Sequence, residues 1–77
     1  MRPIYLRTAR ERKRWTQKRL EAESGVAQAV ISRLETMPNA KAEFDTARNL
    51  AAALGIDLHR LRFGPDPRRV ARDAAGI

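Results

Sequence analysis

The sequence predicts an all-α fold, and three observations lead to this class. No stretch of the 77 residues alternates between apolar and polar side chains with the two-residue period of a half-buried strand. Segments with apolar residues three and four positions apart are instead separated by brief turns. Aromatic residues make up only 5% of the chain while apolar residues make up 43%, which fits a compact helical module better than a β-sandwich. A chain of this length forms one domain with one small core.

The first two helices are predicted from their ends. Pro3 suits the first turn of a helix over residues 4–13, where its missing N–H costs nothing. The inner face of this helix is predicted to hold Tyr5, Leu6 and Ala9. Thr16 is a good N-cap for a second helix that ends near Ser24, with Gly25 as the residue that follows it. Its apolar positions are Leu20 and Ala22.

A third helix is predicted over residues 28–36, where Ile31 and Leu34 share one face. Pro38 ends it and favours an extended conformation for Met37, so residues 38–42 form a loop. A fourth helix over residues 44–54 has its apolar residues at spacings of three and four, namely Phe44, Ala47, Leu50, Ala51 and Leu54.

Beyond Gly55, which ends the fourth helix, Asp57 is predicted to cap a short fifth helix that runs to about Leu61. Asp66, Pro67 and Gly76 bracket a sixth helix over residues 67–75. Val70 is its one large apolar residue, so this helix has little to bury by itself and is expected to fray or to be ordered by a partner.

The net charge of +7 is concentrated at the start of the chain. Residues 1–19 hold eight basic side chains and one acid, 8 − 1 = +7, while residues 20–77 balance at eight against eight. This asymmetry indicates a polyanionic partner, with nucleic acid ahead of an acidic protein or lipid surface; a solvated basic helix is the alternative.

Several classes of function are not expected. The chain has no cysteine and therefore no disulfide, zinc knuckle or thiol nucleophile, and we expect no metal or cofactor. His59 is the only histidine and has no carboxylate pair near it in sequence, so we expect a binding protein rather than an enzyme. The longest apolar run, residues 50–54, is far below the roughly 20 residues of a membrane span, and no signal peptide is evident. A cytoplasmic location is expected.

The segment from Trp15 to Glu35, WTQKRLEAESGVAQAVISRLE, resembles the helix-turn-helix of the Xre/Cro family of phage repressors and their bacterial relatives. Residues 50–58, LAAALGIDL, resemble the family's fourth helix and the start of the fifth. The resemblance covers residues 4–63 and implies a five-helix, lambda-repressor-like DNA-binding domain with the helix-turn-helix at helices two and three. We therefore divide the chain into a DNA-binding domain, residues 1–63, and a C-terminal tail, residues 64–77, that makes dimer or partner contacts.

The resemblance also implies which residues meet DNA. Gln17 would meet a phosphate at the start of the second helix, and Gln28 would reach adenine or a neighbouring phosphate. Arg33 would read guanine or bind phosphate, and Ala29 and Val30 could contact a thymine methyl group. For each polar residue the alternative is an ordinary surface or capping role. The remaining expected DNA-binding residues are Arg14, Lys18, Ser32, Asn39 and Lys41.

The chain departs from the family pattern in three places. Ala27 stands where the family usually has Ser or Thr, which would remove an N-cap worth about 1 kcal/mol from the third helix. The apolar pair Ala29–Val30 occupies positions that are often polar, and Met37–Pro38 replaces a preferred glycine. Arg10 and Glu35 align with a structural ion pair of the family, which we expect to link the first and third helices.

The expected function is sequence-specific binding of double-stranded DNA by a homodimer on an inverted repeat, as a transcriptional repressor. Two half-sites about 34 Å apart would supply the contact area that one small module lacks, and dimer contacts are expected from Leu58, Leu61, Phe63 and the tail. One alternative is an antitoxin that regulates its own operon and holds a toxin protein with its tail. A second is a protein–protein adaptor that uses the same fold without binding DNA.

Overall fold

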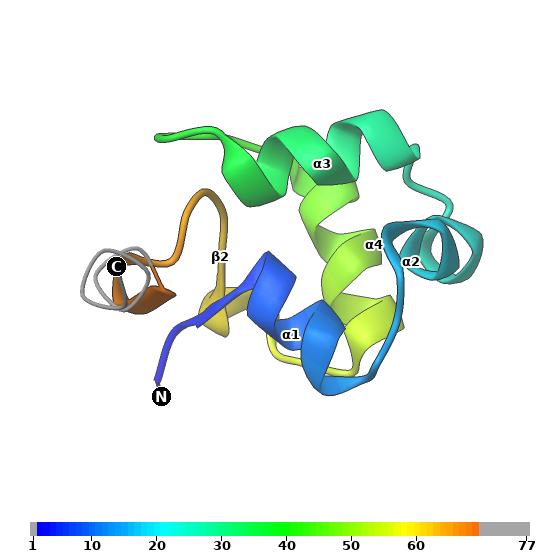
Figure 1. Cartoon of the computed structure of the whole chain (residues 1–77). Coiled ribbons are helices and arrows are strands. Elements are labelled where there is room, and N and C mark those ends of the chain that lie inside the picture. Colours follow the sequence, from blue (N-terminus) through cyan, green and yellow to red (C-terminus); the bar gives the residue numbers. More distant parts are fainter. Residues whose placement is uncertain (1, 70–77) are drawn as a thin grey trace.

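The computed structural model describes residues 2–69 and confirms the all-α class (Figure 1). The helices are α1 (Leu6–Arg12), α2 (Gln17–Ser24), α3 (Gln28–Thr36), α4 (Phe44–Leu54) and the short 3₁₀ helix η1 (Leu58–Arg60). Two strands of two residues each, β1 (Ile4–Tyr5) and β2 (Leu61–Arg62), accompany them. In Figure 1, α4 passes through the middle of the domain, with α3 above it, α2 to the right and α1 below.

The start of the chain differs from the prediction, because the first helix begins at Leu6 and not at residue 4. Ile4 and Tyr5 form a parallel pair with β2, in the register Ile4 to Leu61 and Tyr5 to Arg62. Pro3 therefore precedes a strand instead of occupying the first turn of a helix. Tyr5 has an extended backbone and is the residue directly before α1, so the pairing with β2 takes the place of the first helical turn.

The second and third helices begin and end where the sequence predicts. The side chain of Thr16 caps α2 by accepting a hydrogen bond from the backbone N–H of Arg19 at 3.0 Å. Gly25 ends α2 in the left-handed region with a φ of 76°. A Cβ at Gly25 would meet nothing within 4 Å, so the backbone angle alone favours glycine there. Ala22, predicted as an apolar face position, is exposed.

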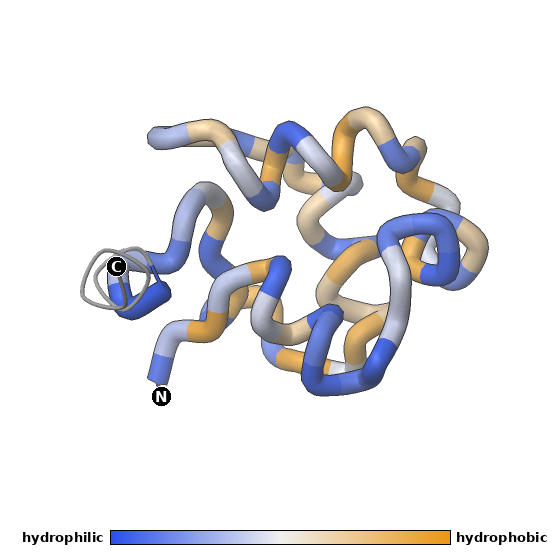
Figure 2. The backbone as a smooth tube through the Cα atoms, viewed as in Figure 1, coloured by the Kyte–Doolittle hydropathy of each residue, from blue (hydrophilic) through white to orange (hydrophobic). Residues whose placement is uncertain are grey.

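The core lies between α4 and the other helices. Five side chains are fully buried and come from all four α-helices: Leu6, Leu20, Ile31, Leu34 and Leu50. These residues belong to one apolar cluster, and Figure 2 shows the hydrophobic stretches of the chain in orange. Phe44 was predicted to join this core, but 67% of it is exposed. It is the first residue of α4, and its ring lies 5.9 Å from the guanidinium of the exposed Arg48.

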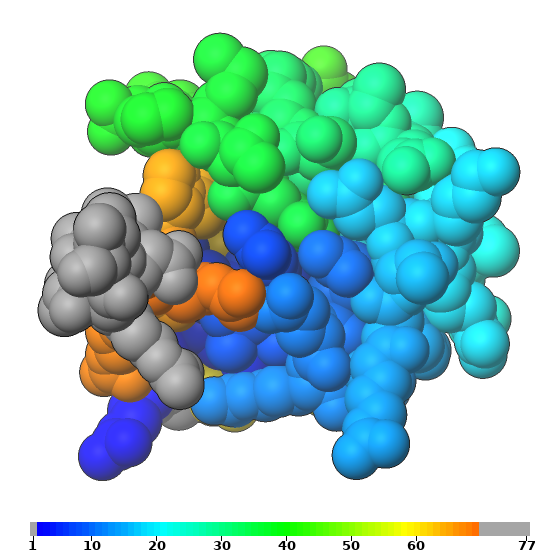
Figure 3. Space-filling view, in the orientation of Figure 1, coloured from blue at the N-terminus to red at the C-terminus, as the bar shows by residue number. Residues whose placement is uncertain are grey.

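Residues 64–69 pack against the ends of two helices. The backbone N–H of Gly64 donates to the carbonyl of Leu34 in the last turn of α3 at 2.6 Å. Asp66 caps a helical turn at residues 67–69 by accepting from the N–H of Arg68 at 2.9 Å, as predicted for the start of the sixth helix. The rest of that helix lies outside the described residues. In Figure 3 this segment, in orange, touches α1, in blue, where Arg69 pairs with Glu11.

None of the helices within residues 2–69 is both long and apolar enough to cross a membrane.

Candidate nucleic-acid interface

The turn between α2 and α3 is fixed by local hydrogen bonds and by apolar packing. The hydroxyl of Ser24 donates to the carbonyl of Leu20 at 2.6 Å and accepts from the N–H of Val26 at 3.1 Å. Val26 is buried directly after the left-handed Gly25. The two helices are thereby held in a fixed relation, with one face of α3 left uncovered.

The start of α3 is capped by a residue that the sequence analysis did not consider. Ala27 has no side chain that can accept a hydrogen bond, but the backbone N–H of Gln28 donates to the carboxylate of Glu21 on α2 at 2.9 Å. The expected loss of the side-chain N-cap at Ala27 is therefore confirmed, and α2 compensates for it in part by supplying an acceptor across the turn. A search limited to residues next to the helix start could not find it.

The outward face of α3 consists of Ala29, Ser32, Arg33 and Thr36, which lie close together at about 100° of rotation per residue. Three of these residues are exposed, and Ser32 is half-buried. Thr36 was missed, although its spacing from Ser32 and Arg33 could have indicated it; its hydroxyl donates to the carbonyl of Ser32 at 2.8 Å. Val30 packs partly against the core, so less of it is available to DNA than the sequence suggested.

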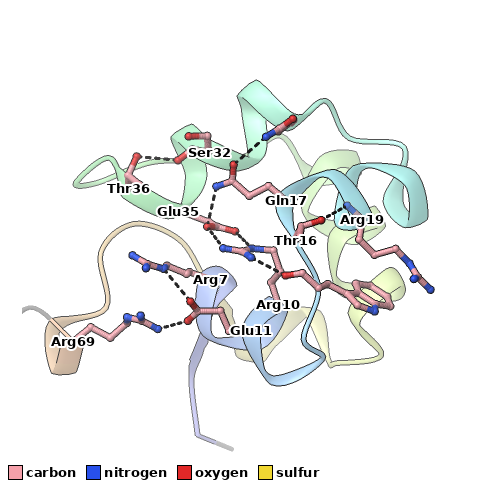
Figure 4. A network of polar contacts seen from close by, with 12 residues as sticks. Arg7, Arg10, Glu11, Thr16, Gln17, Arg19, Ser32, Glu35, Thr36 and Arg69 are labelled. Carbon is pink, nitrogen blue, oxygen red and sulfur yellow. Dashed lines mark hydrogen bonds and ion pairs between the residues drawn. The ribbon is translucent and has the colours of Figure 1, made fainter.

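A polar network lies beneath this face and joins α1, α2 and α3 (Figure 4). The guanidinium of Arg10 donates to both carboxylate oxygens of Glu35, at 2.7 and 3.0 Å, and to the carbonyl of Trp15 at 2.7 Å. Gln17 donates to Glu35 at 3.2 Å, and Gln28 donates to Gln17 at 3.5 Å. The amides at the starts of α2 and α3 are therefore linked to each other and anchored to a buried ion pair.

The ion pair between Arg10 and Glu35 is largely shielded from water, and this affects the pKa of Arg10. The side chain of Glu35 is 1% exposed and that of Arg10 is 12% exposed. The hydrogen bond to Glu35 raises the pKa of Arg10 above its ordinary value, against the opposing effect of burial. Arg10 is thus positively charged throughout the physiological range, and it neutralises a carboxylate that has little access to water.

Four of the expected DNA-binding residues lie outside α3 and are all exposed, namely Arg14, Lys18, Asn39 and Lys41. Lys18 belongs to α2, and the other three lie in the segments before α2 and after α3. Arg14 and Asn39 both have a φ of 59°, in the left-handed region. Asn tolerates this conformation, whereas an arginine is rare there. Arg14 occupies the position after the end of α1 where glycine is usual, and its N–H bonds the carbonyl of Glu11 at 2.9 Å.

The indole ring of Trp15, at the α1–α2 turn, contacts the cationic groups of Lys13 and Arg19. The ammonium of Lys13 lies 4.8 Å from the centre of the indole ring, and the guanidinium of Arg19 lies 5.2 Å from it. Such contacts hold the cations near the ring face. Two of the eight basic side chains at the start of the chain are therefore held beside Trp15, just before and within the first turn of α2.

The three residues expected to make dimer contacts differ in how much of each side chain is exposed. Leu58 and Phe63 are half-buried and pack against the edge of the core. Leu61 is only 5% exposed, because its side chain belongs to the core and its backbone forms β2. The expectation that Leu61 contacts a second subunit is therefore corrected, since its side chain is already covered within the chain.

Comparison with known proteins agrees with this geometry. A family model described as helix-turn-helix matches residues 6–61, which span α1 to the first residue of β2. No curated protein matches the chain, and no solved structure matches it either. The matched region contains the α2–α3 turn, the exposed face of α3 and the polar network beneath it. The chain belongs to the helix-turn-helix family of the Xre and lambda Cro type, a family of DNA-binding transcription regulators.

Proposed function

We propose that this protein binds double-stranded DNA sequence-specifically as a homodimer on an inverted repeat, and that it represses transcription there. The observation that carries the proposal is the linked amide pair, Gln17 and Gln28, at the adjoining starts of α2 and α3, beside the exposed face of α3. Small side chains on that face allow α3 to approach the floor of a major groove closely. Repression requires only that the bound dimer occupy its operator.

In this proposal the two amides have different roles. Gln17 lies at the start of α2, where the helix dipole favours an anion, and it contacts a phosphate. Gln28 lies at the start of α3 and reads adenine in the groove. Because each amide restricts the other, little side-chain entropy is lost when the protein binds. Arg33 reads a further base, and Arg14, Lys18, Asn39 and Lys41 contact phosphates on either side.

A dimer is proposed because one module of this size covers little DNA. We assign the contact between subunits to Leu58 and Phe63. Both residues come late in the chain, well after the α2–α3 turn. The two recognition helices would then enter successive major grooves about 34 Å apart. The surface buried on DNA would double, and the site would have twofold symmetry.

Selection of duplexes from a random library with the purified protein, combined with size-exclusion chromatography, tests the proposal. We expect an enriched inverted repeat and an affinity that falls about 10³–10⁵-fold between 50 and 200 mM salt, from about 6–10 phosphate contacts per dimer. An affinity that does not depend on salt would refute DNA binding and favour the adaptor. An enriched single half-site would refute the dimer. A toxin encoded next to the gene that co-purifies with the protein would favour the antitoxin.

A further inference from the structure

Glu21 combines two features that the family assignment does not explain. It is an acidic residue on α2 of a protein that is expected to bind a polyanion, and its carboxylate accepts a hydrogen bond from the N–H of Gln28, the first residue of α3. Ala27, directly before α3, has no side-chain cap of its own. We propose that Glu21 is a positioning residue that sets the base-reading amide of Gln28 and lowers affinity for non-cognate DNA. This inference rests on the proposed function.

The positioning role follows from the connections of Gln28. Its backbone is held by Glu21 at 2.9 Å and its side chain by Gln17 at 3.5 Å. Ala27 has an extended ψ of 140° and no capping side chain, so the first turn of α3 is free to fray without Glu21. A frayed first turn displaces Gln28 from the groove but leaves Arg33, about one and a half helical turns later, in place. The loss therefore falls on base reading.

The charge and the positioning role of Glu21 have different effects on specificity. The carboxylate lies at the start of the helix that enters the groove, where it repels any duplex equally, so the charge lowers cognate and non-cognate affinity by the same factor. The hydrogen bond from the N–H of Gln28 supports the base contact, which only a cognate duplex provides. Through this hydrogen bond Glu21 increases the ratio of specific to non-specific affinity, which determines occupancy of a site among many competing sequences.

Glu23 provides a matched control on the same helix. It is exposed and pairs with Arg19 at 3.2 Å, and it makes no contact with Gln28 among the hydrogen bonds of residues 2–69. Substitutions at Glu23 therefore remove the same charge from α2 and leave the start of α3 unchanged.

The test compares variants on two fluorescent duplexes, the repeat recovered by selection and a scrambled duplex of equal composition. Glu21→Ala should lower affinity for the selected duplex about 5-fold relative to the scrambled one, and adding Ala27→Ser should restore the ratio to within about 2-fold. Glu21→Gln keeps an acceptor and removes the charge, so affinity for both duplexes should rise about 2–5-fold and their ratio should stay unchanged. Glu23→Ala and Glu23→Gln should change both affinities by equal factors.

Amide hydrogen exchange in the absence of DNA gives an independent measurement. The N–H of Gln28 should lose protection from exchange in Glu21→Ala and retain it in Glu21→Gln and Glu23→Ala, when each variant is measured equally far below its own melting temperature. An unchanged affinity ratio in Glu21→Ala, or a ratio that Ala27→Ser does not restore, overturns the inference even when the wild-type protein binds DNA. If the wild-type protein binds no duplex, the proposed function fails, and the exchange of the Gln28 N–H alone decides whether Glu21 holds the start of α3.

Discussion

The buried ion pair between Arg10 and Glu35 should be the most sensitive polar contact in the domain. Arg10→Ala removes three short hydrogen bonds at 2.7, 2.7 and 3.0 Å and leaves the Glu35 carboxylate, which is 1% exposed, with Gln17 as its remaining partner. Breaking one partner of a buried pair costs about 3–5 kcal/mol. A chain of this length has a total stability of about 4–12 kcal/mol, so the variant should lose much of it.

Urea denaturation followed by circular dichroism measures this loss, with the free energy of unfolding extrapolated to water. The melting temperature should fall by about 12–40 °C, at roughly 4–8 °C per kcal/mol for a domain of this size. Replacing both partners, as in Arg10→Met with Glu35→Met, should recover most of the stability, because no unpaired charge remains buried. The pKa of Arg10 is raised in the folded state, so the stabilisation that the Arg10 charge provides is complete below the ordinary pKa of arginine and should not vary between pH 5 and 9.

A loss below about 1 kcal/mol in Arg10→Ala, or a double-mutant coupling energy near zero, would refute this reasoning. Either result would mean that Glu35 finds water or another donor when Arg10 is absent. The link between α1 and the two amides would then have no energetic role.

Three further predictions concern other parts of the domain. Arg14→Gly should raise the free energy of unfolding by about 0.5–1 kcal/mol, because glycine relieves the left-handed conformation, and should weaken DNA binding at low salt. Burial alone would raise the pKa of Glu11, but the charges and hydrogen bonds of Arg69 and Arg7 outweigh it and lower the pKa. The stability that the Glu11 carboxylate gains from these arginines is therefore complete above pH 4.5 and is lost as the pH falls through the pKa of Glu11 in the folded state. In Arg69→Ala, the free energy of unfolding should depend less on pH below 4.5 than it does in the unsubstituted protein. Arg33→Ala should cost about 1–3 kcal/mol at one base pair, whereas Lys41→Ala should weaken all duplexes equally and reduce the salt slope by about one per half-site; equal losses on all duplexes for both variants would make Arg33 a phosphate contact.

The sequence was sufficient for the parts of the fold that depend on local rules. The cap at Thr16 and the left-handed Gly25 gave the bounds of α2 and the start of the turn, because both act within one helical turn. Phe44 was misplaced for the same reason: its spacing fits the inner face of α4, but spacing does not show where the neighbouring elements end. Burial at a helix end depends on the whole fold.

Contacts between distant residues were the ones that the sequence could not provide. A strand of two residues has no periodicity, so the pairing of Ile4 with Leu61 left no pattern to find. The cap from Glu21 crosses a turn and is visible only once α2 and α3 are placed together. In the candidate interface, residue types indicated which side chains bind DNA, but not that the amides of Gln17 and Gln28 would be linked.

The pairing of β1 with β2 also bears on how the chain folds. It joins residues 57 positions apart, 61 − 4, and closing a loop of this length costs about 3–4 kcal/mol of chain entropy. The contacts among neighbouring helices close much shorter loops, so they should form first and offset this cost before the strands meet. During synthesis, Ile4 has no partner until Leu61 has left the ribosome. Ile4 and Tyr5 are thus made before the helices but reach their strand partners after the helices have packed, and a bulky domain joined before Ile4 should slow this final step more than it affects the helices.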